Sequence, residues 1–302
     1  MQKNRLGRSD LLVSEIGLGC MSLGTDETAA RRIIDEALEL GINFFDTADL
    51  YDQGLNETIV GKALAGRRQE VVLATKVGNR IIPGQPGWVW DASKEYIMEA
   101  VKHSLRRLNT DYIDLYQLHG GTLEDPIDET IEAFERLKEQ GWIRWYGISS
   151  IRPNVIREYV RRSNIVSVMN QYSIVDRRAE EEVIPLLAEH GISIIARGPV
   201  AKGILTDNGA HKAEQGFLDY SKAELLELRG RLQELSAGKR SLTHTALRYC
   251  LDEPTVAVTL AGASSVEQLR DNVAACRAPA LTREERAAIQ AVSRANVYTQ
   301  HR

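Results

Sequence analysis

The chain has 302 residues and a formal net charge of −4; 43% of its residues are hydrophobic and 26% are charged. This composition is ordinary for a folded globular protein and excludes intrinsic disorder, and the charge gives no reason to expect a nucleic-acid partner. The three cysteines, Cys20, Cys250 and Cys276, lie far apart, which argues against a disulfide framework and a cysteine-based metal site. No stretch reaches the roughly 18 apolar residues of a membrane span, and no apolar leader follows the N-terminus. We therefore expect a cytoplasmic protein without a membrane partner.

The first predicted element is a hairpin over residues 4–14, where Gly7–Asp10 forms a turn between two short apolar runs. After it, a short β-branched run followed by an amphipathic helical pattern recurs eight times. The predicted strands cover residues 16–19, 42–45, 71–75, 113–118, 143–148, 165–169, 192–196 and 256–260. An irregular stretch to about residue 220 and two helical patterns, 221–236 and 243–252, follow the seventh strand. A last helix, about 282–295, is appended to the repeat.

Eight strands that each precede a helix predict a parallel sheet, because parallel neighbours need a crossover connection. Eight such units close into a barrel, so we expect an α/β protein with one domain over residues 1–302. Its architecture would be a (β/α)8 TIM barrel with an N-terminal β-hairpin and an extra C-terminal helix. An open doubly wound sheet is the alternative, but the first turn, Gly17–Gly24, lacks the Gly-x-Gly-x-x-Gly dinucleotide fingerprint.

Polar side chains stand at the ends of three consecutive predicted strands. Asp46 ends the second strand, Lys76 the third and His119 the fourth, and Tyr51 follows Asp46 by five residues. Each alone has an ordinary explanation as a turn cap, a surface lysine or a packed imidazole. Together they would meet at the C-terminal face of a barrel, where the loops after the strands carry function. The pattern predicts a proton-transfer site.

The combination has a chemical reason. A phenol keeps its proton at neutral pH, and a nearby ammonium favours loss of that proton. Lys76 would supply this charge to Tyr51 if the Asp46 carboxylate kept the lysine protonated. A neutral His119 would donate a hydrogen bond that orients a substrate carbonyl. The four groups would place an acid over a carbonyl that accepts hydride from a cofactor.

Three runs, Phe45–Tyr51, Leu73–Lys76 and Asp114–His119, resemble motifs of the aldo-keto reductase superfamily. The resemblance covers about residues 6–274 and is closest to bacterial general-stress-type members and potassium-channel β subunits. It implies an NADP(H)-dependent barrel that reduces aldehydes or ketones without a metal. Carried over to this chain, it makes Tyr51 the general acid, tuned by Lys76 and Asp46, while His119 positions the carbonyl.

The resemblance also implies a binding site for NADPH or NADP+. Its predicted residues are Gly19, Cys20, Met21, Asp46, Ser149, Ser150, Gln171, Arg197, Gly198, Pro199, Val200, Lys202, Gly203, Gly262, Ser264, Gln268, Asp271 and Asn272. Of these, Ser149 and Ser150 at the end of the fifth strand and Gln171 after the sixth would contact the nicotinamide carboxamide. The loop after the seventh strand, from Gly198 to Gly203, would run along the pyrophosphate. The turn after the eighth strand would receive the 2′-phosphate and the adenine at a helix N-terminus.

The chain departs from the family at several of these positions. Ser150 replaces the usual Asn, and Arg197 replaces an aromatic residue that stacks on the nicotinamide. A guanidinium can also stack on a ring, but Arg197 could equally turn away into a surface ion pair. Basic residues common in relatives are missing around Ser264, so Arg270 or the 200–220 loop would have to compensate. Ser264 could also be a plain helix cap.

The predicted substrate pocket consists of Tyr51, Trp88, Trp90 and His119. Many relatives carry a bulky Trp after the histidine, whereas this chain has Gly120–Gly121, which predicts a more open site on that side. The two tryptophans could equally be hydrophobic cover for the barrel rim.

The leading interpretation is a monomeric or weakly associating NADPH-dependent reductase whose partner is a small carbonyl substrate. A first alternative is an NADPH-binding, redox-sensing module that regulates a partner and turns over slowly. A second, a metal-dependent barrel hydrolase, needs several converging histidines and carboxylates. Of the six histidines only His119 clearly follows a strand, so no metal is predicted.

Overall fold

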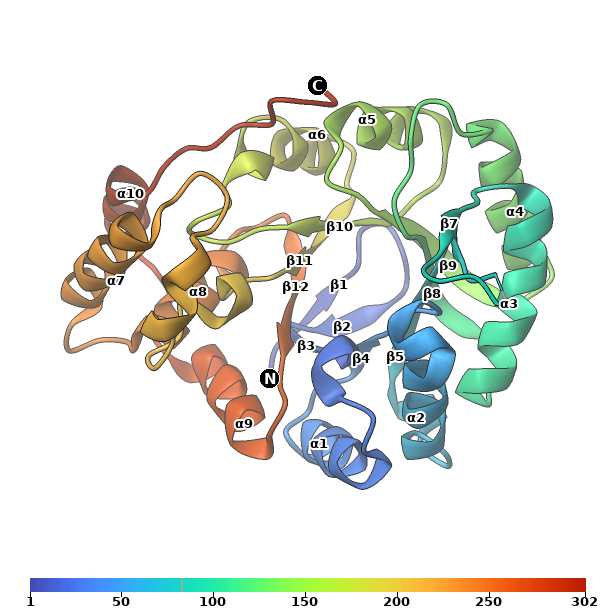
Figure 1. Ribbon diagram of the computed structural model, residues 1–302, viewed down its shortest axis with the longest axis horizontal. Helices are drawn as coiled ribbons and strands as arrows, with labels where there is room; N and C mark the ends of the chain where they lie inside the picture. The colour runs from blue at the N-terminus through green and yellow to red at the C-terminus, as the bar shows by residue number, and fades with distance from the viewer. Residues whose placement is uncertain (83) are drawn as a thin grey trace.

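The computed structural model describes residues 1–82 and 84–302, and eight parallel strands form a closed barrel within an outer ring of helices (Figure 1). The barrel strands are β3 (Ile16–Gly19), β4 (Phe44–Asp46), β5 (Val72–Val77), β8 (Ile113–Leu118), β9 (Ile143–Ser149), β10 (Ser167–Gln171), β11 (Ser193–Arg197) and β12 (Val256–Gly262). Each pairs with the next in chain order, and β12 pairs with β3 to close the ring. The predicted TIM barrel is confirmed.

Helices follow the strands as the periodic pattern predicts. They are α1 (Glu27–Glu39), α2 (Leu55–Ala63), α3 (Lys94–Leu108), α4 (Ile127–Glu139), α5 (Pro153–Arg162), α6 (Val183–Glu189), α7 (Lys222–Ser236), α8 (Leu242–Leu251), α9 (Val266–Ala274) and α10 (Arg283–Val292). In α1 the Asp26 carboxylate caps the first turn by accepting from the backbone N–H groups of Thr28 and Ala29. The buried face of α1 repeats at three- and four-residue spacing and packs on the strands. The appended helix α10 packs against α7.

Apolar side chains fill two layers. One lies between the strands and the helices, and the other lies inside the barrel. The predicted hairpin, β1 (Lys3–Arg5) with β2 (Leu12–Ser14), contributes Leu6, Leu11 and Val13 to the inner layer. It therefore closes the end of the barrel opposite the loops that follow the strands. Asn43 ties it to the barrel, since its Oδ1 accepts the Ser14 N–H at 2.6 Å.

Several strand bounds differ from the expected ones by one or two residues, and two differences concern the loops and strand ends near the site. Strand β10 begins and ends two residues later than predicted, because its pairing with β11 runs from Ser167 through the buried Asn170 to the half-buried Gln171. A short antiparallel ribbon, β6 (Asn79–Arg80) with β7 (Val89–Trp90), lies in the loop after β5 and was not predicted. Two-residue strands are too short to show an alternating pattern.

The segment after α10 returns along the barrel face toward α5 and α6 (Figure 1). The buried Tyr298 phenol donates to Asn170 Oδ1 at 3.2 Å, and the Asn154 N–H donates to the His301 carbonyl at 2.9 Å. This segment thus contacts the ends of β10 and the start of α5. Within the described residues, no helix has the length and apolar character needed to cross a bilayer.

Candidate active site

The ends of β4, β5 and β8 bring the predicted tetrad together. Lys76 is fully buried, and its Nζ lies 2.6 Å from Asp46 Oδ2 and 3.3 Å from the Tyr51 hydroxyl oxygen. The ammonium also donates to the Thr47 carbonyl at 2.7 Å. Gln117 adds a bond that sequence reasoning missed, because its Nε2 donates to Asp46 Oδ1 at 3.2 Å. The lysine is therefore the centre of the cluster, with every proton of its ammonium directed at an oxygen.

Charge pairing keeps Lys76 protonated in this buried position. Burial opposes the charged form, but the Asp46 carboxylate and the Tyr51 phenol outweigh it and raise the pKa of the Lys76 ammonium above its ordinary value. Burial also raises the pKa of the Asp46 carboxyl, against the attraction of Lys76. A buried pair of this kind is costly to break from one side, since the remaining charge then lacks a partner.

A tight turn presents the Tyr51 ring to the lysine. Tyr51 begins a 3-10 turn (Tyr51–Gly54) in which Asp52 and Gln53 have left-handed φ angles of 49° and 56°. Such angles cost free energy in residues with a Cβ, so the surroundings must hold the turn. Directly after the turn, the buried Asn56 anchors the start of α2: its Oδ1 accepts from the Thr47 hydroxyl at 2.7 Å, and its Nδ2 donates to the Cys20 carbonyl at 2.9 Å.

His119 completes the cluster as a neutral imidazole. Burial, with smaller contributions from the positive charges of Lys76 and Arg197, lowers the pKa of His119 to about 3. Its ring lies edge-on to the Tyr51 ring, with centroids 6.0 Å apart, and its backbone N–H is fixed on the Val77 carbonyl at 2.7 Å. The side-chain Nδ1 is buried and has no hydrogen-bond partner among the described residues. An uncharged N–H donor thus stands beside the phenol.

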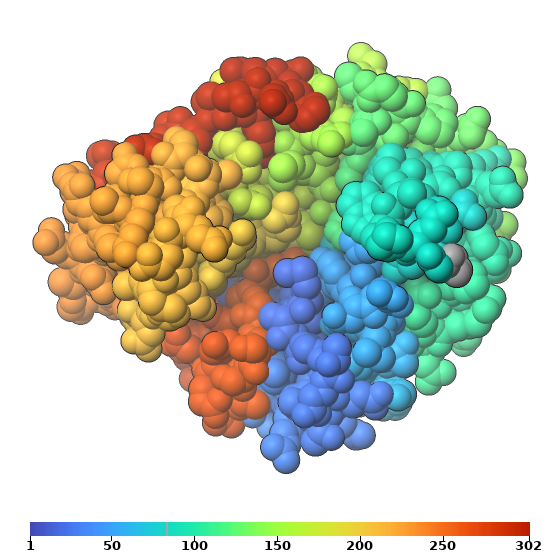
Figure 2. Space-filling view, viewed as in Figure 1, coloured from blue at the N-terminus to red at the C-terminus, as the bar shows by residue number. Residues whose placement is uncertain are grey.

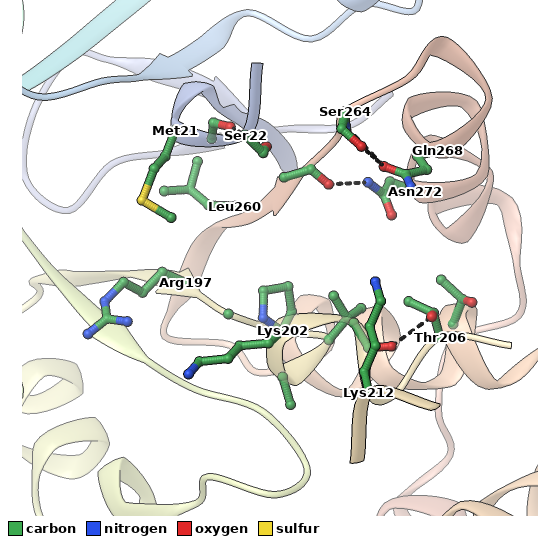
Figure 3. A pocket seen from close by; sticks show the side chains of 18 of the residues that line it. Met21, Ser22, Arg197, Lys202, Thr206, Lys212, Leu260, Ser264, Gln268 and Asn272 are labelled. Carbon is green, nitrogen blue, oxygen red and sulfur yellow. Dashed lines mark hydrogen bonds between the residues drawn. The ribbon is translucent and has the colours of Figure 1, made fainter. Parts of the chain in front are cut away.

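A cleft of about 1070 Å³ opens next to Tyr51 and Asp46. One wall is the end of β12 with the start of α9, and the other is the irregular segment after β11 (Figure 3). Figure 2 shows the same face hollowed between the yellow-orange residues after β11 and the blue residues near Tyr51. The size suits a dinucleotide or a comparably extended ligand.

The predicted cofactor residues divide into two groups. Those lining the cleft are Gly19, Met21, Asp46, Gln171, Arg197, Gly198, Pro199, Val200, Lys202, Gly203, Gly262, Ser264, Gln268, Asp271 and Asn272. Cys20, Ser149 and Ser150 do not line it. The Cys20 thiol is fully buried, and the Ser150 hydroxyl accepts the Arg152 N–H at 3.2 Å within its own turn. Of the predicted substrate residues only Tyr51 lines the cleft, whereas His119, Trp88 and Trp90 lie outside it.

Arg197 is not in a surface ion pair, so that alternative is wrong. The guanidinium lines the cleft and donates to Gln171 Oε1 at 2.8 Å, and no carboxylate in residues 1–82 and 84–302 lies within 4.0 Å of it. Burial lowers the pKa of Arg197, opposed by the attraction of Tyr51. Within the described residues, the arginine therefore faces the ligand space without a carboxylate in contact with it.

The far end of the cleft lies at the N-terminus of α9. Ser265, not Ser264, caps this helix, because its hydroxyl accepts from the Gln268 N–H. Ser264 instead bonds the Gln268 side chain, with 3.0 Å between Oγ and Oε1. Arg270 does not compensate for the missing basic residues here, since it donates twice to Glu36 of α1 and lies outside the cleft.

The segment after β11 supplies cations, of which the sequence predicted Lys202 individually and the others only as part of the 200–220 loop. Lys202, His211 and Lys212 line the cleft, and Figure 3 shows both lysines on the wall opposite Gln268 and Asn272. The Lys212 side chain lies across Gly203, where an added Cβ would meet Nζ at 2.5 Å. Further lining residues that were not predicted are Ser22, Met169, Ala201, Thr206, Asp207, Asn208, Phe217, Thr243 and Leu260. The 197–220 stretch has no periodic pattern, so the family resemblance gave a signal for Gly198–Gly203 but not for the residues that follow.

Comparison with known proteins agrees with this geometry. The model of the aldo/keto reductase family matches residues 15–294. The chain is 58% identical to an oxidoreductase of Bacillus subtilis, YqkF, over the full length of both, and 33% identical to an NADH-specific methylglyoxal reductase of Escherichia coli over 91% of this chain and 93% of that one.

Among solved structures, the holo form of aldo-keto reductase AKR11C1 from Bacillus halodurans has a TM-score of 0.96 and 63% sequence identity, with 100% of this chain and 99% of that chain covered. A glycerol dehydrogenase of Gluconobacter oxydans has a TM-score of 0.86 and 26% identity, covering 96% of this chain and 94% of that one. The chain belongs to the aldo/keto reductase family of oxidoreductases.

Proposed function

We propose that the chain is an NADPH-dependent reductase that converts aldehydes or ketones to alcohols, with Tyr51 as the general acid. The observation that carries this proposal is the Lys76 ammonium, which lies 2.6 Å from Asp46 and 3.3 Å from the Tyr51 hydroxyl at the edge of the cleft. A buried ammonium that touches a phenol prepares the phenol to give up a proton.

The residues present fit a phosphorylated dinucleotide. Three cations, Arg197, Lys202 and Lys212, line the cleft without a carboxylate within 4.0 Å in the part of the chain that the structure describes. Of the lining carboxylates, Asp46 is paired with the Lys76 ammonium, whereas Asp207 and Asp271 have only hydrogen bonds, to Thr243 and His244, so three cations face two carboxylates without a cationic partner. The cleft thus carries excess positive charge that an anionic ligand would neutralise. Gln171 and Arg197 would meet the nicotinamide, and the two lysines would meet phosphates.

In the proposed reaction the nicotinamide cofactor, when bound, supplies the hydride. The chain then has two tasks at the carbonyl oxygen. The neutral His119 imidazole donates a hydrogen bond that orients the carbonyl, and the Tyr51 hydroxyl delivers its proton to the developing alkoxide. Lys76, held by Asp46, stabilises the phenolate that remains on Tyr51. Neutral His119 suits this role, since an imidazolium would compete with Tyr51 as the proton donor.

The test is consumption of the reduced cofactor with a panel of simple aldehydes, measured with NADPH, with NADH and with Tyr51→Phe. NADH is included because a relative is an NADH-specific reductase. We expect turnover that prefers NADPH and falls by about 100- to 10,000-fold in the variant, while NADPH still binds. Equal or better turnover with NADH would refute the cofactor assignment, and an active variant would refute the role of Tyr51.

Tight NADPH binding without turnover on any carbonyl would instead support the alternative of a redox-sensing module that regulates a partner. A separate measurement of NADPH affinity, by quenching of tryptophan fluorescence, keeps these outcomes apart.

A further inference from the structure

Two buried carboxyl groups, Asp49 and Glu57, flank the turn that presents Tyr51. Asp49 is the second residue of the turn Ala48–Tyr51, in which the Tyr51 N–H donates to the Ala48 carbonyl at 3.2 Å. Glu57 lies in the first turn of α2, which packs beside α3 in the outer ring (Figure 1). Asp49 is 7% exposed and Glu57 is 0% exposed. Carboxyl groups are rarely buried to this extent unless a cation or several donors compensate for the lost water.

Glu57 binds the guanidinium that packs beneath the Tyr51 turn. Its Oε2 accepts from Arg107 Nε at 2.6 Å, and its Oε1 accepts from the Thr75 hydroxyl at 2.6 Å. The same arginine lies against the end of the Tyr51–Gly54 turn, because a Cβ added to Gly54 would meet Arg107 Cδ and Nε at 2.9 Å. Both carboxylate oxygens of Glu57 are therefore satisfied, and Arg107 is fixed between this carboxylate and the turn.

Asp49 has no comparable partner. No cation in residues 1–82 and 84–302 lies within 4.0 Å of its carboxyl, since Lys76 pairs with Asp46 and Arg107 with Glu57. The buried Oδ1 of Asp49 has no hydrogen-bond partner among these residues. A carboxylate in such a position costs much more free energy than a neutral carboxyl group. One guanidinium cannot neutralise two carboxylates, so this arrangement favours a proton on Asp49.

The charges around Asp49 support the same assignment. The charged and titratable groups that face it from α2, α3, β5 and β8 are Glu57, Arg107, Tyr96, Lys76 and Tyr116. The two cations of this set are already paired with other carboxylates. Burial and the repulsion from Glu57 raise the pKa of Asp49 to about 8, against the attraction of Arg107 and Lys76. The Asp49 carboxyl is therefore mostly neutral at pH 7.

We propose that Asp49 is a positioning residue that holds the Tyr51 turn in place while it carries a proton and releases the turn when it ionises. This inference rests on the proposed reductase function, in which Tyr51 is the acid. An Asp49 carboxylate is repelled by Glu57 and competes with it for Arg107, which packs against the end of the turn. Either response displaces the Tyr51 hydroxyl, which lies 3.3 Å from Lys76 Nζ. Turnover should therefore fall in alkaline solution.

The first experiment measures urea unfolding of the wild type and Asp49→Asn at pH 5 and pH 7. The amide keeps the shape of the carboxyl group and does not ionise. The pKa of Asp49 lies above its ordinary value of 3.8 in the folded chain, so the unfolded chain loses this proton first as the pH rises, and stability falls. The unfolding constant of the wild type, relative to that of the variant, should rise about a hundredfold between pH 5 and pH 7. His119 titrates in both proteins, so its contribution cancels.

Asp114→Asn is the matched control at pH 7. The Asp114 carboxylate is also buried, but it pairs with Arg68 at 2.8 Å and with Arg144 at 2.9 Å. Its substitution leaves two arginines without their shared partner, so the control should unfold at a lower urea concentration than the wild type. Asp49→Asn should unfold at a higher concentration. The two substitutions are chemically identical, and the opposite signs report the different charge states of the two carboxyl groups.

The second experiment measures kcat for an aldehyde at saturating NADPH at pH 7 and pH 9. The ratio of the wild-type kcat to the Asp49→Asn kcat should fall about tenfold over this range, because the neutral fraction of Asp49 falls from about nine tenths to about one tenth. Ionisation of Tyr51 itself affects both proteins and cancels in the ratio. The Kd of NADPH should be the same in both, since Asp49 lies outside the cleft.

Three results would overturn the inference. A relative unfolding constant that stays the same from pH 5 to pH 7 would mean that Asp49 is ionised in the folded chain. A kcat ratio that stays the same from pH 7 to pH 9, beside a pH-dependent stability, would mean that the proton on Asp49 does not position Tyr51. If the wild type reduces no carbonyl at pH 7, the proposed function fails and the positioning role with it. The unfolding measurements need no turnover, so they still decide whether Asp49 carries the proton.

Discussion

Two parts of the barrel differ in how their charged side chains are paired: the strands from β4 to β8, and the segment after β11. Between β4 and β8, two buried charged groups have a charged protein partner: Lys76 has Asp46, and Glu57 accepts from Arg107 at 2.6 Å. Beyond β11, Arg197, Lys202 and Lys212 face the cleft without a carboxylate partner within the described residues. The pairs in the first part need no ligand, whereas beyond β11 the three cations outnumber the lining carboxylates Asp207 and Asp271, so this part of the cleft is expected to attract an anion. Catalytic geometry and cofactor affinity should therefore respond separately to mutation.

The largest effect on stability and activity should follow from breaking the ion pair between Lys76 and Asp46. Lys76→Met leaves the Asp46 carboxylate buried without its cation, and we expect a loss of about 3–5 kcal/mol in unfolding free energy, together with loss of turnover. Urea unfolding measures the first quantity. The double variant Lys76→Met with Asp46→Asn should recover part of the stability but none of the activity. A single variant as stable as the wild type would contradict the pairing.

A second prediction uses pH to probe the neutral imidazole. The pKa of His119 is about 3 in the folded chain and about 6.5 when unfolded, so the unfolded state binds the extra proton first as the pH falls. Stability should therefore decline below pH 6.5 by about 1.4 kcal/mol per pH unit from this residue. His119→Gln lacks this contribution, so between pH 7 and pH 5 it should lose about 2 kcal/mol less than the wild type. Parallel stability curves for the two proteins would refute a neutral His119 with a lowered pKa.

Substitution of the cleft lysines Lys202 and Lys212 should lower the affinity for NADPH and leave the free energy of unfolding nearly unchanged. Lys212→Gln and Lys202→Gln should each weaken NADPH binding about tenfold, or roughly 1.4 kcal/mol, and reduce its dependence on salt. Unfolding free energy should change little, because neither lysine has a carboxylate partner to lose. Lys222→Gln is the control, since that lysine pairs with Glu214 at 2.6 Å and lies outside the cleft. An equal loss of affinity in the control would refute the proposal that Lys202 and Lys212 bind the phosphates of NADPH.

The smallest expected effect concerns the redox state of the cofactor. Oxidised nicotinamide carries a positive charge, so the nearby Arg197 guanidinium should disfavour NADP+ relative to NADPH. Arg197→Tyr should raise the affinity for NADP+ relative to NADPH several-fold, by roughly 1 kcal/mol. Dissociation constants for both forms in both proteins measure the ratio. An unchanged ratio would mean that Arg197 does not sense the charge of the ring.

Sequence patterns predicted the catalytic residues at the strand ends better than the residues of the loops that surround the site. Asp46, Lys76 and His119 were placed correctly because strand periodicity locates strand ends and a barrel gathers those ends on one face. Lys212 could not be placed, since the stretch after β11 has no period and its path depends on tertiary packing. Trp90 was predicted to line the substrate pocket, but its position against Gly78 and Gly120 depends on a ribbon of two-residue strands, which no sequence pattern indicates. The expectation of an open site beyond His119 is wrong, because Trp90 occupies the space above Gly120. The single domain, the monomeric state and the cytoplasmic location stay predictions.

Closure of the ring has a consequence for synthesis of the chain. Strand β3 pairs with β12, so during synthesis Gly17 cannot pair until Leu260, roughly 240 residues later, has been added. At ordinary rates of translation, tens of seconds pass before that partner leaves the ribosome. During this time β3 presents an unpaired edge that other strands can join. A nascent chain that stalls before Val256 should therefore depend on chaperones, although the strands that carry the tetrad have already emerged.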